Sequence, residues 1–236
     1  MDLKERVTGV SQDTHWYYVS KSQALMQAIG AREPKRILDV GAGTGFFARM
    51  VLRHTRAASA LCIDSGYSGD WDEIHAGKPI AFRRDGEVGD ADLVLMMDVL
   101  EHVDDDVALL RRFSMRAAAG TRFIVSVPAF SFLWSPHDEF LEHRRRYTLN
   151  GTVRVITASG LTPVSGFYFF ASVFPAVAAQ RLGRRLWRTP AAPASDLREH
   201  SRSVNRLLTW LGRAESSIAR HNRAFGLTAF AIGEKR

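Results

Sequence analysis

The stretch that decides the fold is Arg36-Ile37-Leu38-Asp39-Val40-Gly41-Ala42-Gly43-Thr44-Gly45-Phe46-Phe47. An apolar, β-prone run carries Asp39 near its end, three glycines follow on alternate positions, and an apolar helix-compatible segment begins at Phe46. Glycine lets the backbone turn sharply and come close to a ligand. The order therefore predicts the first strand, the nucleotide-binding loop and the first helix of an α/β domain.

Two details indicate which nucleotide such a loop would bind. A dinucleotide fingerprint needs a further glycine at the position of Phe46, so that pattern fails. The Asp39 carboxylate would repel a pyrophosphate but suits an ammonium group. A second apolar run, 60–63, ends in Asp64, where an acid meets ribose hydroxyls in nucleotide-binding α/β folds. S-adenosylmethionine carries an ammonium, a ribose and no phosphate, and is the expected ligand.

The stretch resembles the acid-x-Gly-x-Gly-x-Gly motif of the class I S-adenosylmethionine-dependent methyltransferases. The resemblance implies a Rossmann-like α/β fold with a seven-stranded, mostly parallel sheet, an antiparallel last strand, helices on both faces and, here, a helical insertion before the last strand. A glycine turn in an unrelated α/β protein is the alternative. The residues expected to bind the cofactor are Asp39, Gly41, Ala42, Gly43, Gly45, Asp64, Ser65, Asp85, Met97 and Asp98; Asp85 is equally compatible with a turn.

The amino-acid composition limits the classes of protein to which the chain can belong. The chain has 236 residues, 46% of them hydrophobic, and one cysteine, Cys62, so we expect a full core, no disulfide framework and a reducing, cytoplasmic location. The net charge is +7, and residues 164–223 hold ten arginines and three acidic residues, so the excess lies in one segment. No nucleic-acid partner is expected, although a pI near 10 keeps an RNA-modifying protein as an alternative.

The organisation expected along the chain has four parts: an N-terminal lid or helix (1–35), the cofactor-binding core (36–167), a helical apolar and basic insertion (168–223) and the last core strand (224–236). Within the insertion, aromatic residues adjoin arginines over 167–188. That pattern favours a peripheral element on the inner face of the cytoplasmic membrane. A homodimer interface or a lid is the alternative.

A metal site is a further possibility. Asp98, Glu101 and His102 are spaced i, i+3, i+4 and would share a helical face, where they could chelate a divalent cation such as magnesium. Some ubiquinone-biosynthesis O-methyltransferases resemble this arrangement. The alternative is a helix start with favourable acids and a structural histidine.

The segment 130–148 follows the expected fifth strand, so it should lie over the reaction centre. Its pattern Leu-Trp-Ser-x-His-Asp, then His-x-Arg-Arg-Tyr-Thr, resembles bacterial methyltransferases of the ubiquinone/menaquinone-biosynthesis type. His137 or His143 could remove the acceptor's proton and Asp138 could orient an imidazole. The catalytic candidates are His137, Asp138, His143 and Tyr147. A salt-bridged loop framework is the alternative.

The expected activity is methyl transfer from S-adenosylmethionine to an oxygen of a small aromatic, phenolic or lipid-linked acceptor. Three alternatives stay open at this point. One is C- or N-methylation of another metabolite or of a polyene or pigment head group. The second is an RNA-modifying or nucleic-acid-binding protein, and the third is a cofactor-binding scaffold without catalysis.

Overall fold

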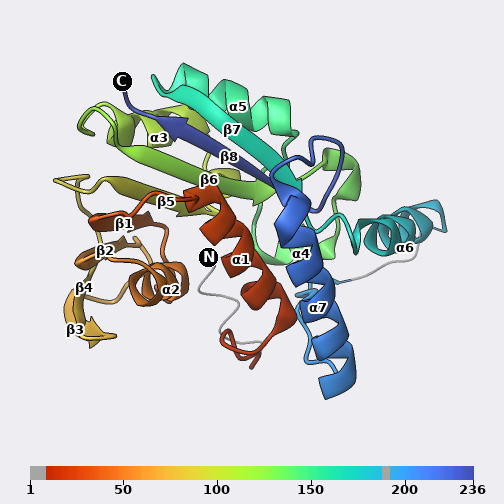
Figure 1. The fold of residues 1–236 in the computed structure, drawn as a ribbon. Helices are drawn as coiled ribbons and strands as arrows, with labels where there is room; N and C mark the ends of the chain where they lie inside the picture. The colour runs from red at the N-terminus through yellow and green to blue at the C-terminus, as the bar shows by residue number, and fades with distance from the viewer. Residues whose placement is uncertain (1–8, 188–191) are drawn as a thin grey trace.

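The computed structural model describes residues 9–187 and 192–236, which form one mixed sheet flanked by helices (Figure 1). The strand order is β3-β4-β2-β1-β5-β6-β8-β7. The strands are β1 (Arg36–Val40), β2 (Ser59–Ile63), β3 (Trp71–His75), β4 (Lys78–Arg83), β5 (Leu93–Met97), β6 (Arg122–Pro128), β7 (Thr162–Phe169) and β8 (Thr228–Glu234). The helices are α1 (Trp16–Ile29), α2 (Phe46–His54), α3 (Asp106–Ser114), α4 (Pro136–Phe140), α5 (Leu149–Ala158), α6 (Phe174–Leu186) and α7 (Arg202–Ala219), with 3₁₀ turns η2 (Leu100–His102) and η3 (Ser131–Leu133).

The predicted Rossmann-like sheet is confirmed. Strands β4, β2, β1, β5 and β6 pair in parallel, and the last strand, β8, lies antiparallel between β6 and β7. The described residues add an eighth strand, β3, which pairs antiparallel with β4 at the sheet edge. Ala76 and Gly77 both have positive φ angles, 51° and 74°, as a two-residue hairpin turn requires. This edge strand was not among the elements expected from the sequence.

The glycine loop has the strained geometry that its sequence predicts. Gly41 and Gly45 have φ angles of 66° and 72°, a region that other residues rarely adopt. A Cβ atom at Gly45 would lie 2.6 Å from the ring of Phe82, and one at Gly41 would lie 2.6 Å from Val99. The close packing of the glycine loop against Phe82 of β4 and Val99 after β5 therefore depends on these two glycines.

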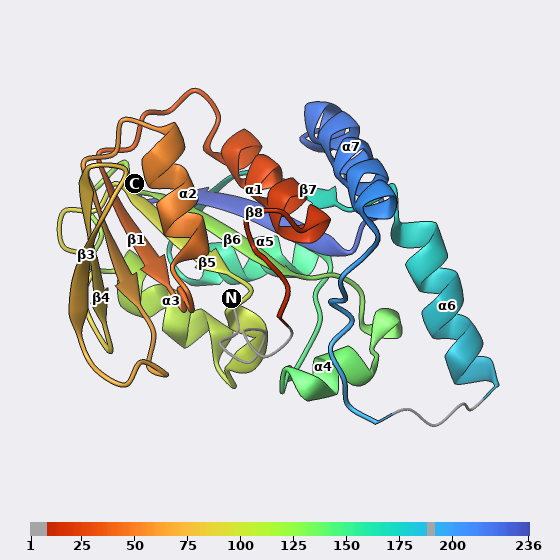
Figure 2. The same ribbon diagram turned by 90° about the horizontal axis from the view of Figure 1, so that it is seen from below.

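Helices cover both faces of the sheet, as expected. Figure 2 shows α1, α2 and α7 on one side and α3 and α5 on the other. Each side has its own buried apolar cluster, one built on Leu25 and Phe47 and the other on Leu110 and Ile156. Alternate strand residues contribute to the two clusters because successive side chains point to opposite faces.

The helical insertion consists of α6 and α7. Helix α7 packs along α1, where Gly212 lies close against Ser20 (Figures 1 and 2). The expectation of a surface element beginning at residue 167 is wrong for its first part, since 167–170 are at most 4% exposed and belong to the core. Phe167, Phe169 and Phe170 belong to the apolar cluster on the α1 side of the sheet, whereas Tyr168 belongs to the cluster on the other side and stacks on Phe130. Within the described ranges, no helix combines the length and apolarity needed to span a bilayer.

Candidate active site

Two cavities meet where the parallel strands end. The glycine-loop cavity, of about 580 Å³, adjoins Gly41 and Asp64, and the helix cavity, of about 480 Å³, lies among α1, α4, α6 and the start of α7. Asp98, His102 and Leu141 line both, so the two cavities are adjacent. Ligands of open α/β sheets bind at this edge. A third cavity, of about 600 Å³ over β2 and β4, is lined by none of the predicted site residues.

Asp64 organises the glycine-loop cavity. Its carboxylate accepts hydrogen bonds from the backbone N–H groups of Gly43 and Gly66, both at 2.9 Å, which joins the loop after β1 to the end of β2. Ser65 and Asp85 also line this cavity. Arg112 donates to Asp85 at 2.5 Å and holds the pKa of that carboxyl below its usual range. Of the predicted cofactor residues, the lining contains Gly41, Asp64, Ser65, Asp85 and Asp98, and it does not contain Asp39, Ala42, Gly43, Gly45 or Met97.

Asp39 lies buried beneath the glycine loop rather than in the cavity wall. The backbone N–H of Ala48 donates to its carboxyl group, and its second oxygen, Oδ2, has no hydrogen-bond partner among the residues described. Burial raises the pKa of Asp39 to about 7. A contact between this carboxylate and a ligand ammonium therefore stays a prediction.

Asp98 is bound to the N-terminal helix. It follows β5 with a φ of 57°, forms an ion pair with the fully buried Lys21 of α1 and accepts a hydrogen bond from Ser126 Oγ at 3.2 Å. Lys21 also donates to the Tyr17 hydroxyl. Burial is the largest single influence and opposes the ionised form of Asp98, but the charge of Lys21, its hydrogen bond and smaller contributions from other positive groups together lower the pKa of the carboxyl. The ion pair thus couples α1 to the junction of the two cavities.

The expected helical face of Asp98, Glu101 and His102 is not present. Only the 3₁₀ turn η2 forms here, because α3 begins later, where the Asp105 side chain caps Ala108 N–H at 2.8 Å. Asp98 consequently points to Lys21, and the group of possible metal ligands that the described residues bring together is Glu101, His102 and His143.

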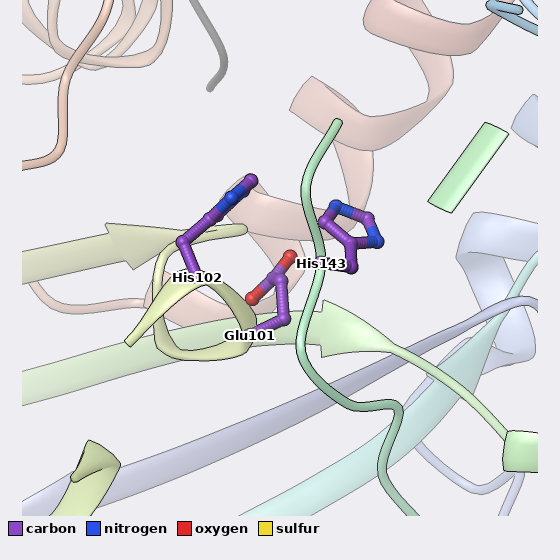
Figure 3. A group of neighbouring side chains, drawn as sticks. All are labelled: Glu101, His102 and His143. Atoms are coloured by element: carbon purple, nitrogen blue, oxygen red, sulfur yellow. The ribbon is translucent and has the colours of Figure 1, made fainter. Parts of the chain in front are cut away.

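Glu101, His102 and His143 have ligand atoms within 4.8 Å of one another. In Figure 3 the Glu101 carboxylate lies between the two imidazoles. Both carboxylate oxygens of Glu101 and Nε2 of His143 are buried, and none of the three has a hydrogen-bond partner among the described residues. Burial, followed by the negative charge of Asp98, raises the pKa of Glu101 well above its usual range. Buried polar atoms without partners are rare in proteins and indicate a place for a ligand.

A fixed hydrogen-bond network orients His143. Its Nδ1 lies 2.9 Å from Oδ1 of the fully buried Asp138, which also accepts from Arg146 Nε at 2.7 Å. The backbone N–H of Ser135 donates to the other oxygen of Asp138 at 2.8 Å. Burial opposes ionisation, but these donors prevail and hold the pKa of Asp138 below its usual range. The hydrogen bond assigns the proton of neutral His143 to Nδ1, so Nε2 carries the lone pair.

The other histidine candidate, His137, holds a neighbouring segment in place. Its Nδ1 accepts a hydrogen bond from the backbone N–H of Asp196 at 3.1 Å, which assigns its proton to Nε2. Burial lowers the pKa of His137 to about 4. The segment 192–201 passes beside α4 (Figure 2) and is also held by His15, whose Nε2 lies 3.0 Å from the carbonyl oxygen of Arg198.

The structure does not bring Tyr147 to either cavity. Its hydroxyl is buried and donates to Asp106 at 2.7 Å and to the Leu100 carbonyl oxygen at 3.1 Å. Burial and the hydrogen bond to Asp106 raise the pKa of Tyr147. These hydrogen bonds give Tyr147 a structural role, since they attach the loop that precedes α5 to η2 and the start of α3.

Several residues of the site escaped the sequence analysis. Lys21 is the one charged residue in the helix Trp16–Ile29, which is a usable signal for a buried partner. Four arginines line the helix cavity: Arg146, Arg181, Arg184 and Arg198. In the sequence they are part of a generally basic segment, and nothing local distinguishes those that face a cavity.

A family model for a methyltransferase domain matches residues 15–170. Three solved structures resemble the chain. The complex of the Haloferax volcanii Trm112 methyltransferase activator with the putative methyltransferase gives a TM-score of 0.57 at 16% identity, covering 98% of this chain and 93% of that one. The complex of Haemonchus contortus phosphoethanolamine N-methyltransferase 2 with S-adenosyl-L-methionine gives a TM-score of 0.53 at 14% identity, covering 91% of this chain and 52% of that one. The [4+2]-cyclase SpnF gives a TM-score of 0.54 at 14% identity, covering 92% of this chain and 81% of that one. At these identities the likeness concerns the fold, which hosts more than one reaction.

Proposed function

The chain belongs to the S-adenosylmethionine-dependent methyltransferase family, and from this premise we propose that it methylates a hydroxyl group of an acceptor bound in the helix cavity. The observation that carries the proposal is the junction of the two cavities at Asp98 and His102. A cofactor in the glycine-loop cavity would present its methyl group at this junction. Methyl transfer is an in-line displacement at a sulfonium, so holding the acceptor oxygen on the opposite side supplies much of the catalysis.

Proton removal is the second requirement of an oxygen acceptor. The lone pair of His143 Nε2 faces the helix cavity beside Glu101, and Asp138 stabilises the imidazolium that forms when it takes the proton. His137 is the weaker candidate because its Nδ1 already accepts a backbone hydrogen bond. We therefore assign the base to His143, with Asp138 as its positioning residue.

The test is methyl transfer from methyl-labelled S-adenosylmethionine to two matched pools, phenols and alcohols in one and primary amines in the other. Label in the hydroxyl pool alone is the expected result. Label in the amine pool alone would replace the oxygen acceptor by nitrogen. Absence of S-adenosylmethionine binding, measured by calorimetry on the same preparation, would remove the reaction class itself.

The buried carboxylate oxygens of Glu101 and the buried Nε2 of His143, which have no hydrogen-bond partner among the described residues, favour a second candidate role for the cluster, which is metal binding. Two imidazole nitrogens and one carboxylate suit zinc or iron(II) better than magnesium, which prefers oxygen ligands. Glu101, His102 and His143 would hold the ion, which would act as a Lewis acid and lower the pKa of the acceptor hydroxyl. His143 cannot bind metal through Nε2 and act as the base, so metal analysis separates the roles. Full turnover in chelator-treated, metal-free protein would support the role of His143 as the base. Loss of turnover on chelation, with recovery when zinc is added, would support the metal-binding role.

We propose that the end of α6 contacts an anionic membrane surface. Leu186 and Trp187 are 80% and 82% exposed and adjoin the exposed Arg185, a combination that suits anionic lipid. Arg188, which the sequence analysis included, lies outside the described residues. Co-sedimentation with phosphatidylglycerol vesicles but not phosphatidylcholine vesicles, lost in a Leu186→Ser/Trp187→Ser double variant, is expected. A dimer in solution that this double variant converts to monomer would assign the patch to a protein interface instead.

A further inference from the structure

The helix cavity has a basic wall that the proposed reaction does not use. Three of its arginines, Arg181, Arg184 and Arg198, come from α6 and the segment 192–201. Resting on the proposed function, we propose that this wall binds an anionic group of the acceptor, a phosphate or a carboxylate. The site would thus select an acceptor with a hydroxyl at one end and an anion at the other.

Two of the cavity's arginines already have partners. Arg146 donates to Asp138 at 2.7 Å and to the Ala129 carbonyl oxygen at 2.9 Å. Arg181 donates to Asp196 at 2.6 Å and to the Leu133 carbonyl oxygen at 2.7 Å. These two guanidinium groups build the wall, and their charges are largely compensated.

The other two arginines have uncompensated charges. The guanidinium groups of Arg184 and Arg198 have no ion pair or hydrogen bond with any residue in the ranges 9–187 and 192–236. His200, which also lines the cavity, stacks on His15. Guanidinium groups match the geometry of phosphate and carboxylate oxygens, with which they form charge-assisted hydrogen bonds. An anion at the Arg184 and Arg198 side chains would compensate both charges.

The remaining walls give the bound molecule a direction. Asp98, which also lines the glycine-loop cavity, marks one end of the helix cavity, and none of the helix cavity's four arginines lines that neighbouring cavity. Between the ends, the lining is largely apolar and includes Trp16, Val173, Ala176, Val177, Leu197, Leu208 and Leu227. An anion held at α6 would leave an apolar body in the middle and place the hydroxyl near Glu101 and His143.

The test uses protein saturated with S-adenosylhomocysteine and three probes of one chain length: octyl phosphate, octanoate and octyltrimethylammonium. We expect calorimetry to detect the two anions and not the cation, with affinity falling as salt rises. Arg184→Gln and Arg198→Gln should each weaken octyl phosphate binding about five- to tenfold. Arg213→Gln is the matched control, since Arg213 is exposed on α7 and lies outside the cavity lining.

Equal binding of all three probes, or wild-type affinity in both cavity variants, would overturn the inference. Phosphatidic acid vesicles identify the source of the anion. If the vesicles compete with octyl phosphate for the protein, the anion is assigned to a lipid head group. If octyl phosphate binding is unchanged in the presence of the vesicles, the anion is assigned to a soluble acceptor. S-adenosylmethionine affinity should be unchanged in all three variants. Anion binding that fails in protein that still binds S-adenosylmethionine contradicts only this inference, whereas loss of S-adenosylmethionine binding in the wild type contradicts the proposed function.

Discussion

Nδ1 of His143 lies 2.9 Å from Oδ1 of Asp138, and the opposite ring nitrogen, Nε2, is buried without a partner among the described residues. An imidazole fixed in this way has a defined tautomer and a lone pair aimed at one place. The relationship assigns different tasks to two histidines that the sequence presents as equivalent, since Nδ1 of His137 accepts from the backbone at Asp196.

His143→Gln should therefore lower kcat about 10²- to 10⁴-fold, the usual contribution of a general base, with S-adenosylmethionine affinity retained. Asp138→Asn should lower kcat as well and shift its pH profile, because the imidazolium loses its stabilising charge. Steady-state kinetics with calorimetry checks both. The exposed His221→Gln is the control, and equal kcat in His143→Gln and the control would remove His143 as the base.

Tyr147→Phe should leave kcat unchanged and lower the free energy of unfolding by about 1–2 kcal/mol, because buried Asp106 and the Leu100 carbonyl oxygen lose a donor. Urea unfolding and initial-rate assays measure the two effects separately. A large fall in kcat with unchanged stability would return Tyr147 to the catalytic residues.

Lys21→Met should destabilise the protein by about 3 kcal/mol, since it leaves the Asp98 carboxylate in a buried site without its cation. The double variant Lys21→Met/Asp98→Asn should recover part of that loss in urea unfolding. If the double variant is as unstable as the sum of the single variants, the ion pair does not hold α1 against the sheet.

Asp39→Asn should stabilise the unliganded protein above neutral pH by about 1–4 kcal/mol. The folded-state pKa is about 7, above the unfolded value, so between about pH 4 and pH 7 the unfolded state releases a proton that the folded state keeps. Wild-type stability therefore falls as pH rises through this window, and the neutral asparagine avoids that loss. Urea unfolding at pH 4 and pH 8 checks the sign, and an equal effect at both pH values would contradict it.

The same variant tests the predicted ammonium contact of Asp39. If the carboxylate interacts with the cofactor's ammonium, Asp39→Asn should weaken S-adenosylmethionine binding about tenfold while it stabilises the unliganded protein. Calorimetry at pH 8 measures the affinity. Unchanged affinity would limit Asp39 to a buried structural role beneath the glycine loop.

Gly45→Ala should cost about 2–3 kcal/mol, because the residue needs a φ of 72° and its Cβ would lie 2.6 Å from Phe82. Gly69→Ala is the matched control, since nothing lies within 4 Å of a Cβ there. Thermal unfolding of both variants is the measurement. A control that is as destabilised as Gly45→Ala would show that the loop geometry is not the cause.

The sequence by itself determined the local elements that it predicted, which are the strand, turn and helix around Gly41 to Gly45 and the strand that ends before Asp64. The helix that follows Thr148, whose side chain caps it, has an equally local origin. These features depend on periodicity, glycine and capping residues, which act over a few neighbouring positions. The edge strand β3 was missed because it has little burial pattern, and its hairpin signal is only Ala76-Gly77.

Only the tertiary structure decided which side chains meet. It paired Asp98 with Lys21, replaced Asp98 by His143 beside Glu101 and His102, and buried the aromatic run 167–170 in the core. The physical reason is that these contacts join segments far apart in the chain, so they depend on how sheet and helices pack. A spacing such as i, i+3, i+4 has meaning only where a helix forms, and here Asp98 has a φ angle of 57° and precedes a 3₁₀ turn over Leu100–His102.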